Sequence, residues 1–143
     1  MMGSSYKFLE HTADVLFQAE APSLGELFEQ CGLALQETQV DQKSVESKQK
    51  TTISGKNKDV ESLLFDFLDD LVFYKDSEQL VFNKFEIKIK EKNGVYHMTC
   101  EAFGEKLDIK KHDPKVDIKA ITMHMFEVKK TKNGWRAQVL VDI

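Results

Sequence analysis

Acidic groups stand near both ends of this chain, in segments whose other residues favour β-strands. Asp14 closes the run EHTAD, and Asp142 and Ile143 follow the apolar run VLV. Together with the main-chain carboxylate of Ile143 these groups repel one another, so holding them together without a cation is costly. Carboxylates are hard oxygen donors, which suit calcium, magnesium or manganese better than zinc or copper. We therefore predict one metal site formed by Asp14, Asp142 and Ile143, with calcium as the first choice.

Four further polar residues near these ends have weaker claims as supporting groups. His11 and Thr12 can support the site or anchor a turn through hydrogen bonds to the backbone. Lys119 can act as a counter-ion for the carboxylates or lie at the surface with its alkyl chain on apolar neighbours. His124 is a candidate as well, although an isolated histidine is more often structural.

The last two strands must hold Asp142 and Ile143 in place. Asn133-Gly134 is typical of a two-residue hairpin turn between strand-like segments at 118–128 and 135–143. Counting outward from such a turn predicts three opposed pairs: Val128 with Val139, Phe126 with Val141, and His124 with Ile143. This register would bury the Ile143 side chain and fix its carboxylate.

Two amphipathic helices are predicted from capping signals and helical spacing. Ser23 begins a capping box, and Asp59 can cap the second helix. The apolar residues of these helices are Leu24, Leu27, Phe28, Cys31, Ala34 and Leu35 in the first, and Val60, Leu64, Phe67, Leu68 and Leu71 in the second. Three aspartates at 66, 69 and 70 line the other side of the second helix, and a solvated face explains them better than a binding patch.

Alternating residues predict strands in the rest of the chain. Val15 to Glu20 has a period of two, and Asn93-Gly94 favours a tight hairpin between two further strands. Strands with only two helices among them indicate an α+β fold. We predict a single-domain sandwich over residues 1–143, with a mostly antiparallel or mixed sheet and the two helices covering a face.

Composition excludes several classes of protein. The 143 residues are 41% hydrophobic with a net charge of −4, which predicts one globular domain whose contact with RNA is indirect. The two cysteines lack metal-ligand spacing and are expected to be buried thiols. No signal peptide or membrane span is apparent, so we expect a cytoplasmic protein. No phosphate loop, Gly-x-Ser-x-Gly elbow or Cys-His pair is present, which predicts that the chain is not an enzyme.

Several motifs, taken together, resemble the archease family along nearly the whole chain. They are the EHTAD run at 10–14, the leucine-rich acidic helix at 62–68, GEKLD at 104–108, Lys111-His112, IKAIT at 118–122 and the final Asp142-Ile143. Two positions depart from the family pattern. Phe67 stands where many archeases have tryptophan, and Met123-His124-Met125 replaces a Tyr-His-Asp-like run, so no further acidic ligand is expected from that strand.

The resemblance implies a metal bound by the matching aspartates and the carboxy-terminal residue. It also implies a partner, an RtcB-type RNA ligase, whose guanylylation and multiple turnover archeases promote in tRNA splicing and RNA repair. The metal-bearing acidic tip would reach into the ligase nucleotide site. Two alternatives stay open: a chaperone or modulator of a tRNA methyltransferase, and a stand-alone cation-binding domain.

Overall fold

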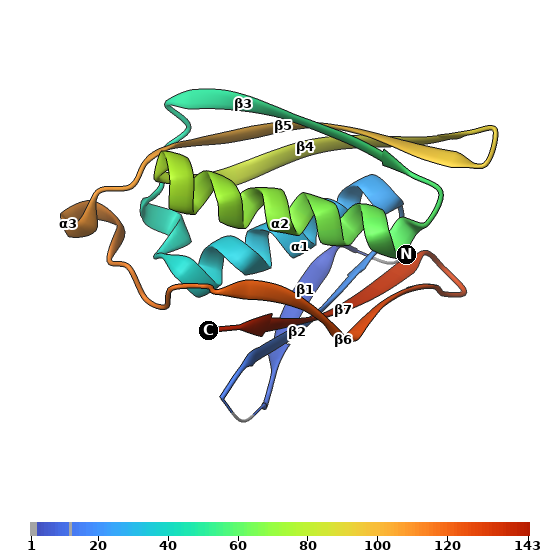
Figure 1. Cartoon of the computed structure of the whole chain (residues 1–143), viewed down its shortest axis with the longest axis horizontal. Coiled ribbons are helices and arrows are strands. Elements are labelled where there is room, and N and C mark those ends of the chain that lie inside the picture. Colours follow the sequence, from blue (N-terminus) through green and yellow to red (C-terminus); the bar gives the residue numbers. More distant parts are fainter. Residues whose placement is uncertain (1–2, 12) are drawn as a thin grey trace.

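The computed structural model describes residues 3–11 and 13–143 and shows two β-sheets with two long helices between them (Figure 1). The four-stranded sheet has the order β1-β2-β7-β6, formed by Ser5–Leu9, Val15–Ala21, Trp135–Asp142 and Ala120–Lys130. The three-stranded sheet has the order β3-β5-β4, formed by Gln49–Asn57, Val95–Lys106 and Leu80–Lys92. The helical segments are α1 (Leu24–Gln39), the 3-10 turn η1 (Gln42–Ser44), α2 (Val60–Glu78) and the short α3 (Ile109–His112).

The predicted α+β class is confirmed, and the arrangement of its layers is now defined. Helix α1 contacts β2 and β4, whereas α2 contacts β3 and β6, so each long helix touches both sheets. All strand pairs are antiparallel. In the described part of the chain, no helix lies over the outer face of the three-stranded sheet (Figure 1).

Both predicted helix caps are present. The Ser23 hydroxyl accepts a hydrogen bond from the Glu26 amide at 3.3 Å. The Asp59 carboxylate accepts from the amides of Glu61 at 3.4 Å and Ser62 at 3.2 Å. These bonds satisfy amides that the first turn of a helix leaves without an intrahelical partner.

The core lies around the two helices. The residues that are at most 1% exposed include most of the predicted apolar faces: Leu27, Phe28, Cys31, Ala34, Leu35, Leu64, Phe67, Leu68 and Leu71. The rings of Phe28 and Phe67 stack between the helices with centroids 6.1 Å apart. Both cysteines are buried and free, as predicted. None of the helices within residues 3–11 and 13–143 is long and apolar enough to cross a membrane.

The hairpin between β4 and β5 has the predicted tight turn. Lys92 lies opposite Val95, which leaves Asn93 and Gly94 as the two turn residues. Their φ angles are 53° and 75°. Turns of this kind need positive φ at both central positions, which asparagine and glycine tolerate.

The register predicted for the last hairpin is wrong. The Thr131 amide donates to the Gly134 carbonyl at 2.8 Å, so the turn has four residues and Lys130 lies opposite Trp135. Further out, an irregularity between Thr122 and Glu127 shifts the register again. The pairs Val128–Val139, Phe126–Val141 and His124–Ile143 therefore do not form, and Ala120 lies opposite Asp142 instead.

The close approach of β5 to β4 predicts that Gly104→Ala is strongly destabilising. A Cβ there would overlap the Val81 carbonyl oxygen and lie 2.8 Å from the Phe82 Cα. We expect a loss of about 2–3 kcal/mol in the free energy of unfolding, measured by urea denaturation. Gly55→Ala is the control, because its Cβ would make an ordinary 3.4 Å contact with Leu63 Cδ1. Equal losses for the two variants would contradict this account.

Candidate functional site

The predicted acidic groups lie at the ends of two neighbouring strands. Val15 is opposite Val141 in the antiparallel pairing of β2 with β7. Asp14 precedes Val15 and Asp142 follows Val141. In this antiparallel register the two aspartates therefore occupy the next pair of opposed positions. Opposed residues in antiparallel strands have Cα atoms about 5 Å apart. Residues that are 128 positions apart in sequence therefore come to one end of the four-stranded sheet.

The chain around Asp142 is held from both sides. The amide of Lys119, the residue before β6, donates to the Asp142 carbonyl at 2.8 Å, so the chain that leads into β6 supports the last residue of β7. The Ile143 side chain is half-buried and packs against the main core. Packing of this side chain limits how far the main chain of Ile143 can move, which is what a ligand group from this residue requires.

The other predicted supporting residues differ in how close they come. His11 is exposed in the loop between β1 and β2, and Thr12 lies outside the described residues. Ala13 has a φ of 71°, a conformation that is uncommon for residues other than glycine, in the turn that leads into Asp14. His124 is exposed in the irregular part of β6, four residues beyond the position opposite Asp142. The structure does not bring His124 to the aspartates.

The donor set at this end fits a hard divalent cation. Among the residues that the structure describes, no group of three or more His, Cys, Asp or Glu side chains is placed to hold a metal. Asp14 and Asp142 supply two carboxylates, and the main-chain carboxylate of Ile143 would be the third. These donors are all oxygen, as calcium, magnesium and manganese prefer. A metal at this acidic tip (Asp14, Asp142 and Ile143) remains a prediction.

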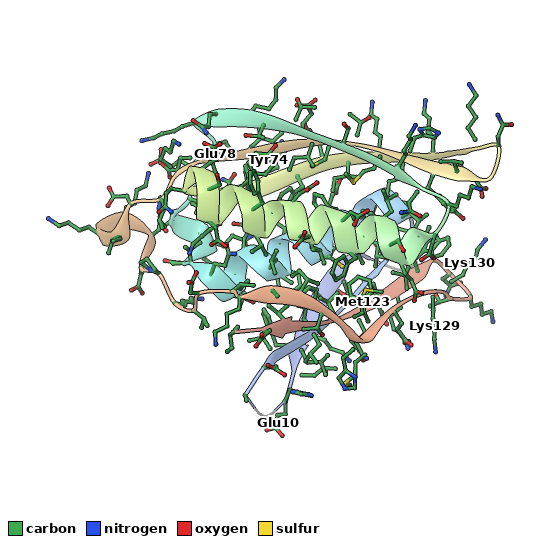
Figure 2. All side chains as sticks on the ribbon, in the orientation of Figure 1. Glu10, Tyr74, Glu78, Met123, Lys129 and Lys130 are labelled. Carbon is green, nitrogen blue, oxygen red and sulfur yellow. The ribbon has the colours of Figure 1, made fainter. Side chains whose placement is uncertain are left out.

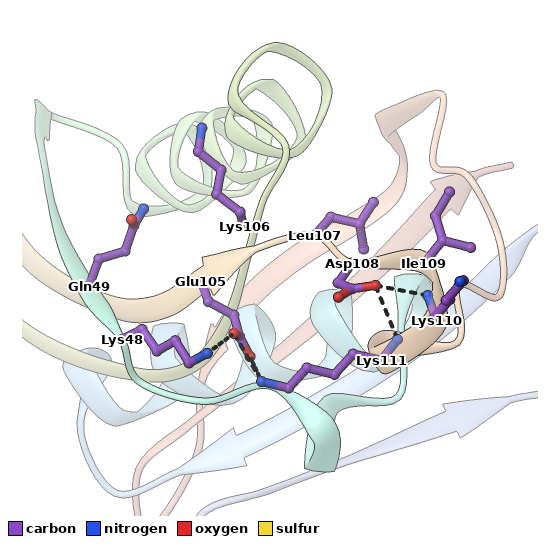
Figure 3. A pocket seen from close by; sticks show the side chains of 9 residues that line it. All are labelled: Lys48, Gln49, Glu105, Lys106, Leu107, Asp108, Ile109, Lys110 and Lys111. Atoms are coloured by element: carbon purple, nitrogen blue, oxygen red, sulfur yellow. Dashed lines mark hydrogen bonds and ion pairs between the residues drawn. The ribbon is translucent and has the colours of Figure 1, made fainter.

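A second charged cluster lies near the end of β5 and was not foreseen. Glu105 is 6% exposed, and its carboxylate accepts hydrogen bonds from Lys111 Nζ at 3.0 Å and from the Glu46 amide at 2.7 Å. His112 Nε2 lies 3.0 Å from the same carboxylate. Figure 3 shows Glu105 between Lys48 and Lys111 in a pocket of about 720 Å³. The cluster connects β5, α3 and the segment that leads into β3.

The hydrogen bonds of His112 define its tautomer. The side chain is completely buried, and its Nδ1 accepts from the Asp108 amide at 2.9 Å. Because Nδ1 is an acceptor, the proton is on Nε2 and is donated to Glu105. Asp108 also caps α3 by accepting from the Lys110 amide at 3.0 Å. The charged segment at 106–115 therefore contains a short capped helix with a buried histidine.

The cluster keeps Glu105 ionised. Burial alone would raise the pKa of this carboxyl, but hydrogen bonds from Lys111, the Glu46 amide and His112, with the charge of Lys111, lower the pKa to about 2. Such a carboxylate is a poor proton acceptor at neutral pH, and its oxygens already have partners. We interpret it as a structural counter-ion. The GEKLD and Lys111-His112 motifs could be seen in the sequence, but the sequence did not show that Glu105 of the first contacts both residues of the second.

The depressed pKa of Glu105 predicts a specific loss of stability in acid. In the unfolded chain a glutamate binds a proton near pH 4.3, whereas in the folded chain Glu105 does so near pH 2. Its contribution to the free energy of unfolding is therefore present above about pH 4.3 and lost as the pH falls towards 2. Urea unfolding between these pH values should show a weaker pH dependence in Glu105→Gln than in the wild type.

Glu101→Gln is the matched control for this experiment. Glu101 lies on the same strand, but it is only partly buried and its ion pair with Lys50 is 3.7 Å long. Its removal should leave the pH dependence of unfolding close to that of the wild type. If Glu105→Gln also left it unchanged, the folded pKa of Glu105 could not be as low as the hydrogen bonds imply.

Comparisons with known sequences agree with the motifs. Residues 6–143 match the model of the archease protein family (MTH1598/TM1083). The chain is 40% identical to protein archease from Methanosarcina barkeri over 142 residues, which covers 99% of this chain and 97% of the relative. It is also 40% identical to protein archease from Pyrococcus furiosus, covering 96% of this chain and 98% of the relative.

Solved structures show the same fold. The solution structure of Methanobacterium thermoautotrophicum protein 1598 matches with a TM-score of 0.86 and 36% identity, covering 96% of this chain and 98% of that one. A crystal structure from Thermotoga maritima, described as an archease and possible chaperone, matches with a TM-score of 0.61 and 20% identity, covering 96% of each chain. From its sequence and its fold, the chain belongs to the archease family.

Proposed function

We propose that this archease activates an RtcB-type RNA ligase in the cytoplasm, promoting ligase guanylylation and multiple turnover in tRNA splicing and RNA repair. The observation that carries the proposal is the pairing of β2 with β7, which brings Asp14 and Asp142 to one end of a sheet. Archease membership supplies the context for the ligase, and the acidic tip supplies the chemistry. In this role the chain is a protein activator that catalyses no reaction itself.

The position of the acidic tip suits a group that enters a partner's cleft. Strands β1 and β2 extend away from the helical layer towards the end at which Asp14 lies (Figure 1). Glu10, labelled in Figure 2, lies in the β1–β2 loop at the edge of the molecule. A hard cation supplies concentrated positive charge that can orient phosphate oxygens of a nucleotide. The residues of this chain would hold that charge at a fixed distance from the core.

Each part of the tip has a separate task in this proposal. Asp14 and Asp142 bind the cation, and the main-chain carboxylate of Ile143 completes the donor set. The buried part of Ile143 and the hydrogen bond from the Lys119 amide hold the last residues in position. Calcium is the first choice of metal, with magnesium or manganese next, because these donors are all oxygen.

A chaperone or modulator of a tRNA methyltransferase is the second candidate. The observation in its favour is a set of large apolar side chains at the surface, among them Phe73, Ile109 and Met123, which are 56%, 74% and 58% exposed. They lie on three separate elements, α2, α3 and β6, and each offers a partner an exposed apolar contact. This function would protect the partner from aggregation without needing the metal, and a stand-alone cation-binding domain would need no partner at all.

Removing either aspartate should weaken calcium binding. We expect Asp14→Asn and Asp142→Asn each to reduce calcium affinity at least tenfold in isothermal titration calorimetry, because each removes a charged ligand. Asp66→Asn is the control, since Asp66 is an exposed acid on α2 whose loss changes the net charge equally. The site would have to lie elsewhere if Asp66→Asn weakened binding as much as the other two.

Ligase turnover tests the proposed activity directly. An RtcB-type ligase with GTP and divalent metal should form more than one product per enzyme only when this protein is present. Asp14→Ala should abolish that increase, and Asp66→Ala should preserve it. One residue added after Ile143 should have the effect of Asp14→Ala, because it moves the carboxylate. Full activation by the extended chain would refute the role of Ile143, and no activation by the wild type would favour the methyltransferase partner.

A further inference from the structure

The outer face of the three-stranded sheet is exposed and rich in lysine. Alternation along each strand directs residues such as Ile53, Ile87 and Cys100 towards the helices, where they are buried. The residues between them point outward and define the lysine face: Lys50, Thr52, Ser54 and Lys56 on β3; His97, Thr99, Glu101 and Phe103 on β5; Lys84, Glu86, Lys88, Lys90 and Lys92 on β4. Figure 2 shows nitrogen-tipped side chains rising from this side of the sheet, at the top of the view.

The positive charge of the lysine face is compensated only at one end. Glu101 pairs with Lys50 and Glu86 with Lys84, each at 3.7 Å, near the start of β4. Within the described residues, Lys56, Lys88, Lys90 and Lys92 have no carboxylate within 4.0 Å. The half of the face nearer the β4–β5 turn therefore carries free positive charge.

The strand register gathers this charge around one histidine. Lys56 and Lys90 lie on opposite sides of His97, because both are its partners in the β3–β5 and β4–β5 pairings. A pocket of about 630 Å³ opens at the same end of the sheet. It is lined by Lys56, Asn57, Lys58, Lys92, Asn93, Val95 and His97. No carboxylate is among these residues, so the pocket suits an anionic group.

The composition of the face favours a polyanion over a protein partner. Protein interfaces have an apolar centre and are depleted in lysine. Here the centre consists of lysines, a histidine and the hydroxyls of Ser54 and Thr99. Lysines and hydroxyls are common donors to phosphate oxygens. Lys88, Lys90 and Lys92 alternate on β4, so they recur about every 6.8 Å and form a row that can follow an extended backbone.

We propose that the lysine face binds the phosphate backbone of single-stranded RNA. An open sheet with positive side chains is a platform on which single strands lie, whereas reading a duplex groove requires a helix or ribbon that enters it. The inference goes beyond ligase activation, since it adds a direct contact with RNA at a surface separate from the acidic tip. The net charge of −4 conceals this surface because it averages the lysine face with acidic regions such as the outer side of α2.

The test is fluorescence anisotropy with a labelled, unstructured twelve-nucleotide uridine RNA. Four uncompensated lysines acting as phosphate contacts predict that log K falls with log salt with a slope of about −2.8 for a single strand. The variant K56Q/K88Q/K90Q should bind at least tenfold more weakly in low salt. Its slope should be shallower by about 2, since three contacts are removed.

The matched control is K43Q/K110Q/K132Q, which removes the same charge from exposed lysines elsewhere on the chain. It should change the affinity by no more than about twofold, and both variants should keep the thermal unfolding midpoint of the wild type. Equal weakening by the two triple variants, or no binding by the wild type, would overturn the proposal. Competition by polyglutamate as effective as that by unlabelled RNA would also overturn it and indicate an acidic protein partner. Ligase activation does not enter this assay, so the two proposals can fail separately.

Discussion

The antiparallel pairing of β2 with β7 is the contact on which the rest of the acidic tip depends. It joins the beginning of the chain to its end, and its register puts Asp14 and Asp142 at neighbouring positions. The inward residues of the same strands, Phe17, Val139 and Val141, are completely buried. A shift by one residue in either strand would move these side chains out of the core and put their outward-facing neighbours in their place. Core packing therefore fixes the register that defines the candidate metal site.

Ionic contacts have a structural role near the carboxyl end of β5. The Glu105 carboxylate connects three segments through hydrogen bonds: β5, α3 and the chain before β3. Two of its partners, Lys111 and His112, lie on the short helix that Asp108 caps. The local hydrogen bonds of this cap therefore help to position side chains that contact Glu105. Charged residues in this protein thus act in two ways. At Glu105 they are paired and structural, whereas Lys56, Lys88, Lys90 and Lys92 on the lysine face have no carboxylate within 4.0 Å among the residues that the structure describes.

Features with short-range causes could be predicted from the sequence. The caps at Ser23 and Asp59 and the tight turn at Asn93-Gly94 depend on adjacent residues, and the structure contains all three. The last hairpin was not predicted correctly, because Asn133-Gly134 is typical of a two-residue turn, whereas this turn has four residues. In addition, β6 contains an irregular segment around Met125, whose φ of 60° is unusual for such a side chain. The contact between Glu105 and the Glu46 amide could not be predicted either, because the two residues are far apart in the sequence. The proximity of Asp14 and Asp142 was inferred from shared chemistry, and strand order supplies its physical basis.

The central claim is that Asp14 and Asp142 act as one site. A double-mutant cycle on calcium affinity tests it most directly, using Asp14→Asn, Asp142→Asn and the double variant in calorimetric titrations. If both carboxylates bind the same ion, the double variant should lose little more affinity than either single variant, because one substitution already disrupts the site. Strictly additive losses would mean that the two aspartates act independently, which would contradict the account.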